Sequence, residues 1–347
     1  MMPNLEQLIA TVQQNCHITD ARHARSMTLC GYLLEMREYY RWEHRLSPSE
    51  PPSRAEVSRW LAARETLWND IEEREFSPLP IEDRLIDPFS SEAVNRALLP
   101  HGLVYGAGIG RFHRPHFFLA ELARQEVRDG VSILISGREL ARDLTAAPAA
   151  LRQGIVYLRR EALERWLWEK AEAWDDQQRD GAFKRAFDCY GFEADPASAI
   201  GRMTESEGET LILHELGEHA AGLLLGVDWE EMLVGFSGRR AEILARAVRD
   251  NLADCMVTLP ALLAREALAS LHFWFANFDG MRRALFPTLA NAYALWCDGG
   301  KTAAIAAACA AGRSHWQEAA DRLLSLHRQG AAEAKIEALF AADALAL

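Results

Sequence analysis

Four ionisable residues stand in the middle of an otherwise apolar stretch, TLILHELGEHAAGLLLG, at residues 210–226. They are His214, Glu215, Glu218 and His219, and at about 100° per residue all four fall within an arc of roughly 140° around one helix. Imidazole and carboxylate groups are ligands suited to zinc, iron or manganese. The spacing therefore predicts a site for a divalent metal ion, with zinc as the first choice.

The same four residues have a simpler interpretation as two pairs one helical turn apart. His214 with Glu218, and Glu215 with His219, would then be surface pairs that each add a few tenths of a kcal/mol. Leu211 falls inside the same arc, which is not typical of a helix face in contact with solvent. If the helix is buried, its charges need partners or a metal.

The segment HELGEH resembles the active-site helix of the HExxH metallopeptidases, the zincins, in which two histidines one turn apart bind zinc. The resemblance covers little more than this helix. It implies that His214 is a ligand and Glu215 the catalytic base, but Glu218 stands at the second histidine position and His219 comes one residue late. Either His214 and Glu218 are the ligands, or Glu215 and His219 are, with Glu218 as the base.

A third ligand is expected on the helix predicted at 237–256, because two ligands on one helix rarely complete a metal site. Glu242 resembles, in its order along the chain, the glutamate that completes some zincin sites. Asp250 and Asp254 lie one turn apart on the same helix. Arginines of this helix offer the alternative that these acids form ordinary ion pairs.

Two further segments hold clustered polar residues. In CHITDARHA, His17, Asp20 and His23 are spaced by three and fall near one helix face. They could be metal ligands or contact a substrate; alternatively, Asp20 caps a helix. In RFHRPH, His113 and His116 flank a predicted turn that could hold substrate. The preceding GAGIG is interpreted as a glycine-bent strand, because a dinucleotide-binding loop would lead into a helix.

Composition and net charge argue against some classes of binding partner. The 347 residues carry a formal charge of −12 at pH 7, which disfavours attraction to nucleic acid or to anionic membranes. No run is long and apolar enough to span a bilayer, and no leader pattern opens the chain, so we expect a cytoplasmic protein. The six cysteines contain no C-x-x-C pair and are expected to be free thiols.

The pattern predicts an α+β fold that is predominantly helical. An N-terminal helical hairpin is expected over 1–76, followed by a domain over 92–347 with a small antiparallel or mixed sheet near 100–160 and helices over 209–347. A helix opened by Thr19 and Asp20 is predicted in the hairpin, a short helix and loop at 138–151, and a long loop at 177–208.

These observations favour a metal-dependent enzyme, a zincin-like hydrolase acting on a small-molecule or peptide substrate. One alternative is a non-catalytic helical protein that binds a partner through its tryptophan-rich segments near 60–68 and 166–174. Another is an iron-dependent oxidoreductase that uses the same acids and histidines.

Overall fold

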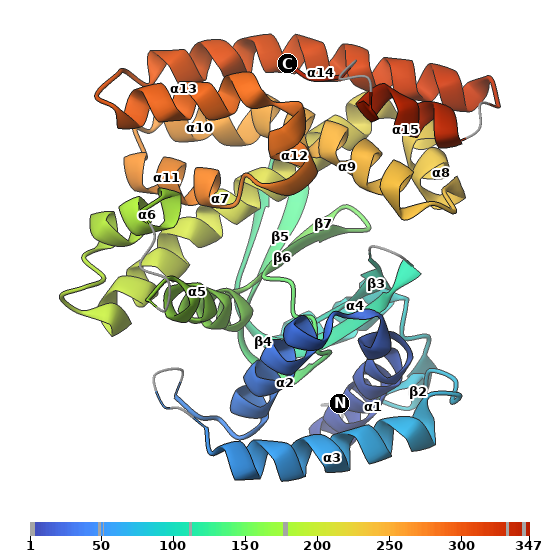
Figure 1. The fold of residues 1–347 in the computed structure, drawn as a ribbon. Helices are drawn as coiled ribbons and strands as arrows, with labels where there is room; N and C mark the ends of the chain where they lie inside the picture. Colours follow the sequence, from blue (N-terminus) through green and yellow to red (C-terminus); the bar gives the residue numbers. More distant parts are fainter. Residues whose placement is uncertain are drawn as a thin grey trace. The chain divides into compact units, whose positions relative to one another are not determined.

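The computed structural model describes residues 4–47, 50, 52–110, 113–175, 180–330, 333–341 and 345–347. The chain forms two compact units, Met1–Glu172 and Ala173–Leu347 (Figure 1). The prediction placed the division between 76 and 92 instead. The structure divides later because the first helix packs against strands of the sheet and so joins the N-terminal helices to it.

The first unit combines helices with two sheets. Its helices are α1 (Leu5–His23), α2 (Leu29–Glu43), α3 (Arg54–Ile71), α4 (Ser91–Leu98) and the start of α5 (Arg160–Asp175), with short turns η1 (Ala24–Ser26) and η2 (Leu99–His101). A hairpin pairs β1 (Leu79–Ile81) with β2 (Arg84–Ile86). The main sheet contains β3 (Leu103–Ile109), β4 (Pro115–Arg128), β5 (Val131–Arg142), β6 (Ala149–Arg152) and β7 (Ile155–Arg159).

The main sheet is mixed and curled. Its order is β3-β4-β5-β7-β6, and only the β5–β7 pair is parallel. The edge strands β3 and β6 nevertheless contact each other, so the sheet bends toward closure. Side chains of successive residues point to opposite faces: Phe117 joins the core beneath α1 and α4, whereas Phe118 joins a second cluster with Tyr157.

Two predictions in the first unit were wrong. Thr19 and Asp20 do not open a helix but lie inside α1, and the following helix α2 is capped by the Thr28 side chain, which accepts a hydrogen bond from the Gly31 amide. Residues 138–142 continue β5, and 149–152 form β6, where a short helix and loop were expected. In both cases tertiary packing outweighs the local signals.

The second unit is helical throughout its described residues. It contains α6 (Ala182–Tyr190), α7 (Pro196–Leu225), α8 (Val227–Gly235), α9 (Arg239–Ala253), α10 (Leu259–Ala264), α11 (Leu268–Ala276), α12 (Gly280–Leu285), α13 (Pro287–Cys297), α14 (Ala303–Arg328) and α15 (Glu333–Ala341). One π-helical turn, η4 (Asp254–Thr258), follows α9. The long loop predicted at 177–208 was wrong: α6 and the first turns of α7 occupy most of it.

The helix that carries His214 begins earlier than predicted because Asp195 caps it, accepting a hydrogen bond from the Ser198 amide, and Pro196 occupies its first turn. Helices α7 and α9 pack closely at Gly217. A Cβ atom there would lie 2.7 Å from the Ala253 carbonyl oxygen. This close approach brings the ionisable residues of α7 near those of α9 and η4.

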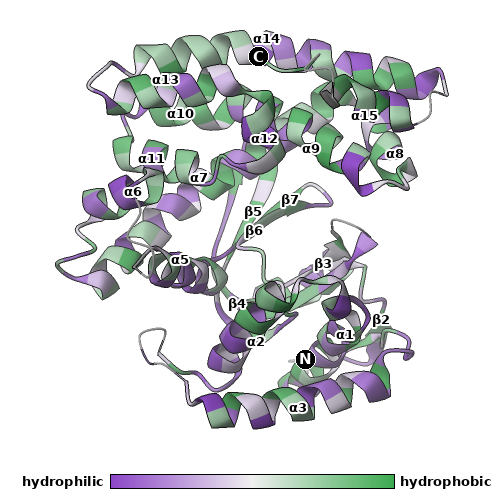
Figure 2. Cartoon of the chain, viewed as in Figure 1, coloured by the Kyte–Doolittle hydropathy of each residue, from purple (hydrophilic) through white to green (hydrophobic). Residues whose placement is uncertain are grey.

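The core of the second unit lies among α7, α8, α9, η4, α13 and α14 and is built around Trp229, Phe286 and Trp316. Along α13 and α14, apolar and polar residues alternate as expected of helices with one buried face (Figure 2). The α+β, predominantly helical fold is confirmed. Among the described residues, no helix has the length and apolar character needed to cross a bilayer.

Candidate functional site

His214 is held between two carboxylates. Its Nδ1 lies 2.9 Å from Oδ1 of Asp254, on η4, and its Nε2 lies 3.5 Å from Oε1 of Glu218, one turn further along α7. The Asp254 side chain is only 1% exposed. The π-helical turn follows α9 directly and places Asp254 against α7.

Two arginines complete the arrangement. Arg249 on α9 donates to Glu218 Oε1 at 2.7 Å and to Asp250 Oδ1 at 3.1 Å. Arg282 on α12 donates to Asp254 Oδ2 at 2.5 Å. We call these six residues, His214, Glu218, Arg249, Asp250, Asp254 and Arg282, the α7 network. It contains three basic and three acidic side chains, so its charges balance when all are ionised.

At His214 and Glu218, attraction to oppositely charged neighbours outweighs the effect of burial on the pKa. Burial alone would lower the pKa of His214, but the Asp254 carboxylate, assisted by Glu218, raises that pKa well above its usual value. Burial would raise the pKa of Glu218, yet the Arg249 guanidinium and then His214 hold it low. Burial and the neighbouring Glu218 carboxylate raise the pKa of Asp250.

The structure thus brings together three of the predicted metal ligands, His214, Glu218 and Asp250, and adds Asp254, which was noted but not assigned. Glu242 instead accepts a hydrogen bond from Arg246 at 2.8 Å, the ordinary ion pair considered as an alternative. Glu215 is buried and His219 partly buried, and neither belongs to the α7 network as defined. The catalytic roles of Glu215 and Glu218 stay predictions.

The donor set of the α7 network is poorly suited to a metal ion. Within the described ranges, no group of three or more His, Cys, Asp or Glu side chains is placed to hold one. Glu218 and Asp254 each accept from an arginine, and a divalent cation bound between them would stand beside both guanidinium groups and be repelled. Arginines neutralise these carboxylates.

The free energy of unfolding should depend on pH in a way that reflects the raised pKa of His214. A histidine whose pKa is raised on folding contributes stability below its unfolded value, near 6.5, and loses that contribution as pH rises through the folded pKa. We expect the free energy of unfolding of the wild type to exceed that of His214→Gln most at about pH 6, and the difference to shrink toward about pH 9.

Urea denaturation at several pH values measures this difference. A His214→Gln difference that stays constant over the same pH range would contradict a charged His214 in the folded protein.

The N-terminal candidates lie on α1 but serve different partners. His17 accepts from Arg64 Nη1, with 2.6 Å between that atom and Nε2, and burial followed by the Arg64 charge lowers the pKa of His17 to about 3. Asp20 accepts hydrogen bonds from the Leu144 amide at 3.0 Å and from Arg114 at 2.8 Å. Asp20 therefore holds the loop after β5 through hydrogen bonds and does not cap a helix.

Burial lowers the pKa of His23, and the charges of Arg114 and His116 lower it further. His116 is the second residue of β4, and its Nδ1 lies 3.1 Å from Asp143 Oδ2. His113 precedes β4 and is exposed. The segment RFHRPH was interpreted as a turn between strands, and β3 and β4 flank it as predicted, with Arg111 and Phe112 outside the described residues.

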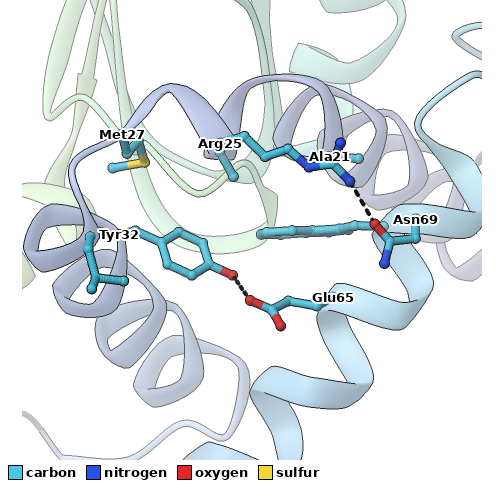
Figure 3. A pocket seen from close by; sticks show the side chains of 9 residues that line it. Ala21, Arg25, Met27, Tyr32, Glu65 and Asn69 are labelled. Carbon is cyan, nitrogen blue, oxygen red and sulfur yellow. Dashed lines mark hydrogen bonds between the residues drawn. The ribbon is translucent and has the colours of Figure 1, made fainter.

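A pocket of about 480 Å³ lies in the first unit where the end of α1, η1, α2 and α3 meet. Its lining is mainly apolar, with Ala21, Ala24, Met27, Leu29, Tyr32 and Trp68, and its polar residues are Arg25, Glu65 and Asn69. In Figure 3, Tyr32 and Glu65 reach toward each other from α2 and α3, joined by a hydrogen bond of 2.9 Å, and Arg25 donates to Asn69 at 2.9 Å. Two polar bridges thus frame an apolar interior.

Two features mark this pocket as a place for a ligand. Leu29 lines it and is 72% exposed, so the pocket opens to solvent at the start of α2. The Nε1 atom of Trp68 is buried and has no hydrogen-bond partner among the described residues. The tryptophan-rich segment 60–68 was singled out in the sequence, but nothing local signalled the contributions of Arg25, Tyr32 and Asn69.

Fold and sites together define a protein of two units, an α+β unit with an open apolar pocket and a helical unit with a buried ionic network. Family models divide the chain in nearly the same way. The N-terminal domain of a family of unknown function, DUF6866, matches residues 7–159, and the C-terminal domain of that family matches residues 164–343. The chain belongs to the DUF6866 family. No curated protein and no solved structure matches it.

Proposed function

We propose that this chain is a binding protein, and that the pocket between α1, α2 and α3 seats an apolar side chain of a partner protein. The observation that carries the proposal is the open apolar pocket with Leu29 exposed at its rim. Interfaces concentrate their binding energy where an aromatic or aliphatic anchor fills such a pocket.

The surface beside the pocket supports a protein partner. On α2, Tyr32 lies about 60° from Leu29 on one side and Leu33 about 40° on the other, so all three share an arc of roughly 100°. Leu33 is 47% exposed. An apolar strip that continues outward from a pocket is typical of a surface that another protein covers.

The polar groups at the pocket are placed as at the rim of an interface. Arg25 and Glu65 are exposed, and they flank apolar residues as charged residues commonly do around an interface core. The partner we propose therefore presents one large apolar side chain surrounded by polar groups.

The α7 network supports binding over metal-dependent hydrolysis. The carboxylates of Glu218 and Asp254 accept hydrogen bonds from Arg249 and Arg282. A metal ion would have to displace these arginines to bind both carboxylates. A network of this kind fixes the packing of α7, α9 and α12 and is assigned a structural role in this proposal.

A photo-crosslinking amino acid at position 29 tests the proposal in the cells that make the protein. The matched control places it at Leu85 in β2, which is also 72% exposed. We expect one crosslinked protein from position 29 and none from position 85. Equal crosslinking from both positions would contradict the proposal, and a crosslinked dimer of this chain would assign the pocket to a second copy instead.

The partner identified in this way is then purified and titrated. Leu29→Asp is expected to weaken its binding about tenfold or more, while changing the stability of this chain by less than about 0.5 kcal/mol because the side chain is exposed. Leu85→Asp should bind like the wild type. Equal dissociation constants for all three proteins would overturn the proposed role of the pocket.

A further inference from the structure

A second, smaller cavity lies within the curl of the main sheet. It measures about 60 Å³ and is lined by residues of β3, β4, β6, β7 and the loop after β5. The basic side chains that line it are those of His116, Arg152 and Arg159, and no Asp or Glu side chain lines it within the described residues. In a chain whose formal charge is −12, such a concentration of basic groups indicates an anion as the ligand.

Two polar atoms at this cavity lack partners. Arg159 is 6% exposed; its Nε donates to Glu139 at 2.6 Å, but its Nη2 has no hydrogen-bond partner among the described residues. The Thr145 Oγ1 atom is also buried, and it too has no hydrogen-bond partner among the residues that the structure describes. Buried donors without partners are costly, and an oxyanion is the kind of acceptor that these two side chains lack.

The carboxylates near the cavity hold its basic side chains from outside the lining. Glu139 accepts from Arg159, and Asp143 lies 3.1 Å from His116 Nδ1. Asp143 also accepts from the Phe117 amide at 3.1 Å. These contacts fix the orientation of Arg159 and His116 without occupying the cavity.

Two glycines of β3 leave space for the side chains that line the cavity. A Cβ atom at Gly106 would lie 2.2 Å from Cε1 of Phe118, and one at Gly108 would lie 2.9 Å from Cδ of Arg152. Arg152 comes from β6, the opposite edge of the sheet, and reaches β3 because the sheet curls. The segment GAGIG thus allows both side chains to lie against β3.

We propose that this cavity binds a small oxyanion, the phosphate or carboxylate group of a small molecule. Its volume holds about four to six water-sized groups, which matches a phosphate or a short carboxylic acid and excludes a nucleotide as a whole. Arg152 and Arg159 supply charged donors, and Thr145 supplies a neutral one. The site is independent of the partner-binding pocket.

Calorimetric titration of the full-length protein with inorganic phosphate and with acetate, against chloride at equal ionic strength, tests the inference. Binding of phosphate alone would assign a phosphate group, and binding of acetate alone a carboxylate group. Heat no greater than that of chloride for both anions would overturn the proposal.

Three variants locate the site. Thr145→Val removes an unpartnered hydroxyl, so it should keep the fold and weaken binding about threefold, and Arg152→Gln should weaken it about tenfold. Arg138→Gln, an exposed charge on β5 paired with Glu121, is the control and should change affinity less than about twofold. Unchanged affinity in both Thr145→Val and Arg152→Gln would place the anion elsewhere and contradict the inference.

Discussion

Asp254→Ala is expected to destabilise the protein by about 2–4 kcal/mol, because it removes a buried carboxylate and leaves the partly buried His214 and Arg282 without their partner. The loss should exceed that for any exposed ion pair in the chain. Equilibrium denaturation in urea, followed by circular dichroism of the helices, measures it. If the variant does not fold, Asp254→Asn, which keeps an oxygen acceptor, should fold with a smaller loss.

Asp228→Ala is the matched control for this prediction. Asp228 accepts from Arg328 at 2.5 Å, but both side chains are substantially exposed, so its removal should cost at most about 1 kcal/mol. Equal losses for the Asp254 and Asp228 variants would mean that the α7 network contributes no more than a surface pair, and would contradict its structural role.

Gly217→Ala is expected to destabilise the second unit by about 1–3 kcal/mol, because the added methyl would lie 2.7 Å from the Ala253 carbonyl oxygen and push α9 away from α7. The shift would also separate Arg249 from Glu218. Thermal unfolding and urea denaturation should therefore both show a less stable protein.

Gly222→Ala, in the same helix, should have the opposite effect. Nothing lies within 4 Å of the position of its added methyl, so the gain in helix propensity should stabilise the protein by about 0.5–1 kcal/mol. A stabilised Gly217→Ala variant would contradict the close approach of the two helices at this position.

The ionic character of the α7 network was predictable from sequence, but its partners were not. The spacing of His214, Glu218 and Asp250 placed them on facing helices, and the structure brings them together. Arg282 comes from α12, and no local pattern connects it with Asp254. The π-helical turn that positions Asp254 also has no signature in a single sequence.

In the fold, too, elements with a local sequence pattern were predictable, whereas elements that depend on tertiary contacts were not. The small sheet predicted near 100–160 is present, and the glycine-bent strand predicted at GAGIG forms part of β3. The strand β6 carries no alternating pattern and exists because β7 offers it an edge. Residues 182–208 were predicted as a loop because they are polar and contain glycine. Phe183, Phe187 and Tyr190 nevertheless recur at helical spacing in α6, which packs against α11, and the Asp195 cap starts α7.

The structural role assigned to the α7 network, and with it the preference for binding over metal-dependent hydrolysis, depends on the claim that arginines, and not a metal ion, neutralise its carboxylates. Plasma mass spectrometry of protein purified without a metal-binding tag tests this claim most directly, with His214→Ala measured beside the wild type. We expect far less than one zinc, iron or manganese per chain in both proteins. About one metal ion per chain in the wild type, lost in His214→Ala, would contradict the account and support the zincin-like site.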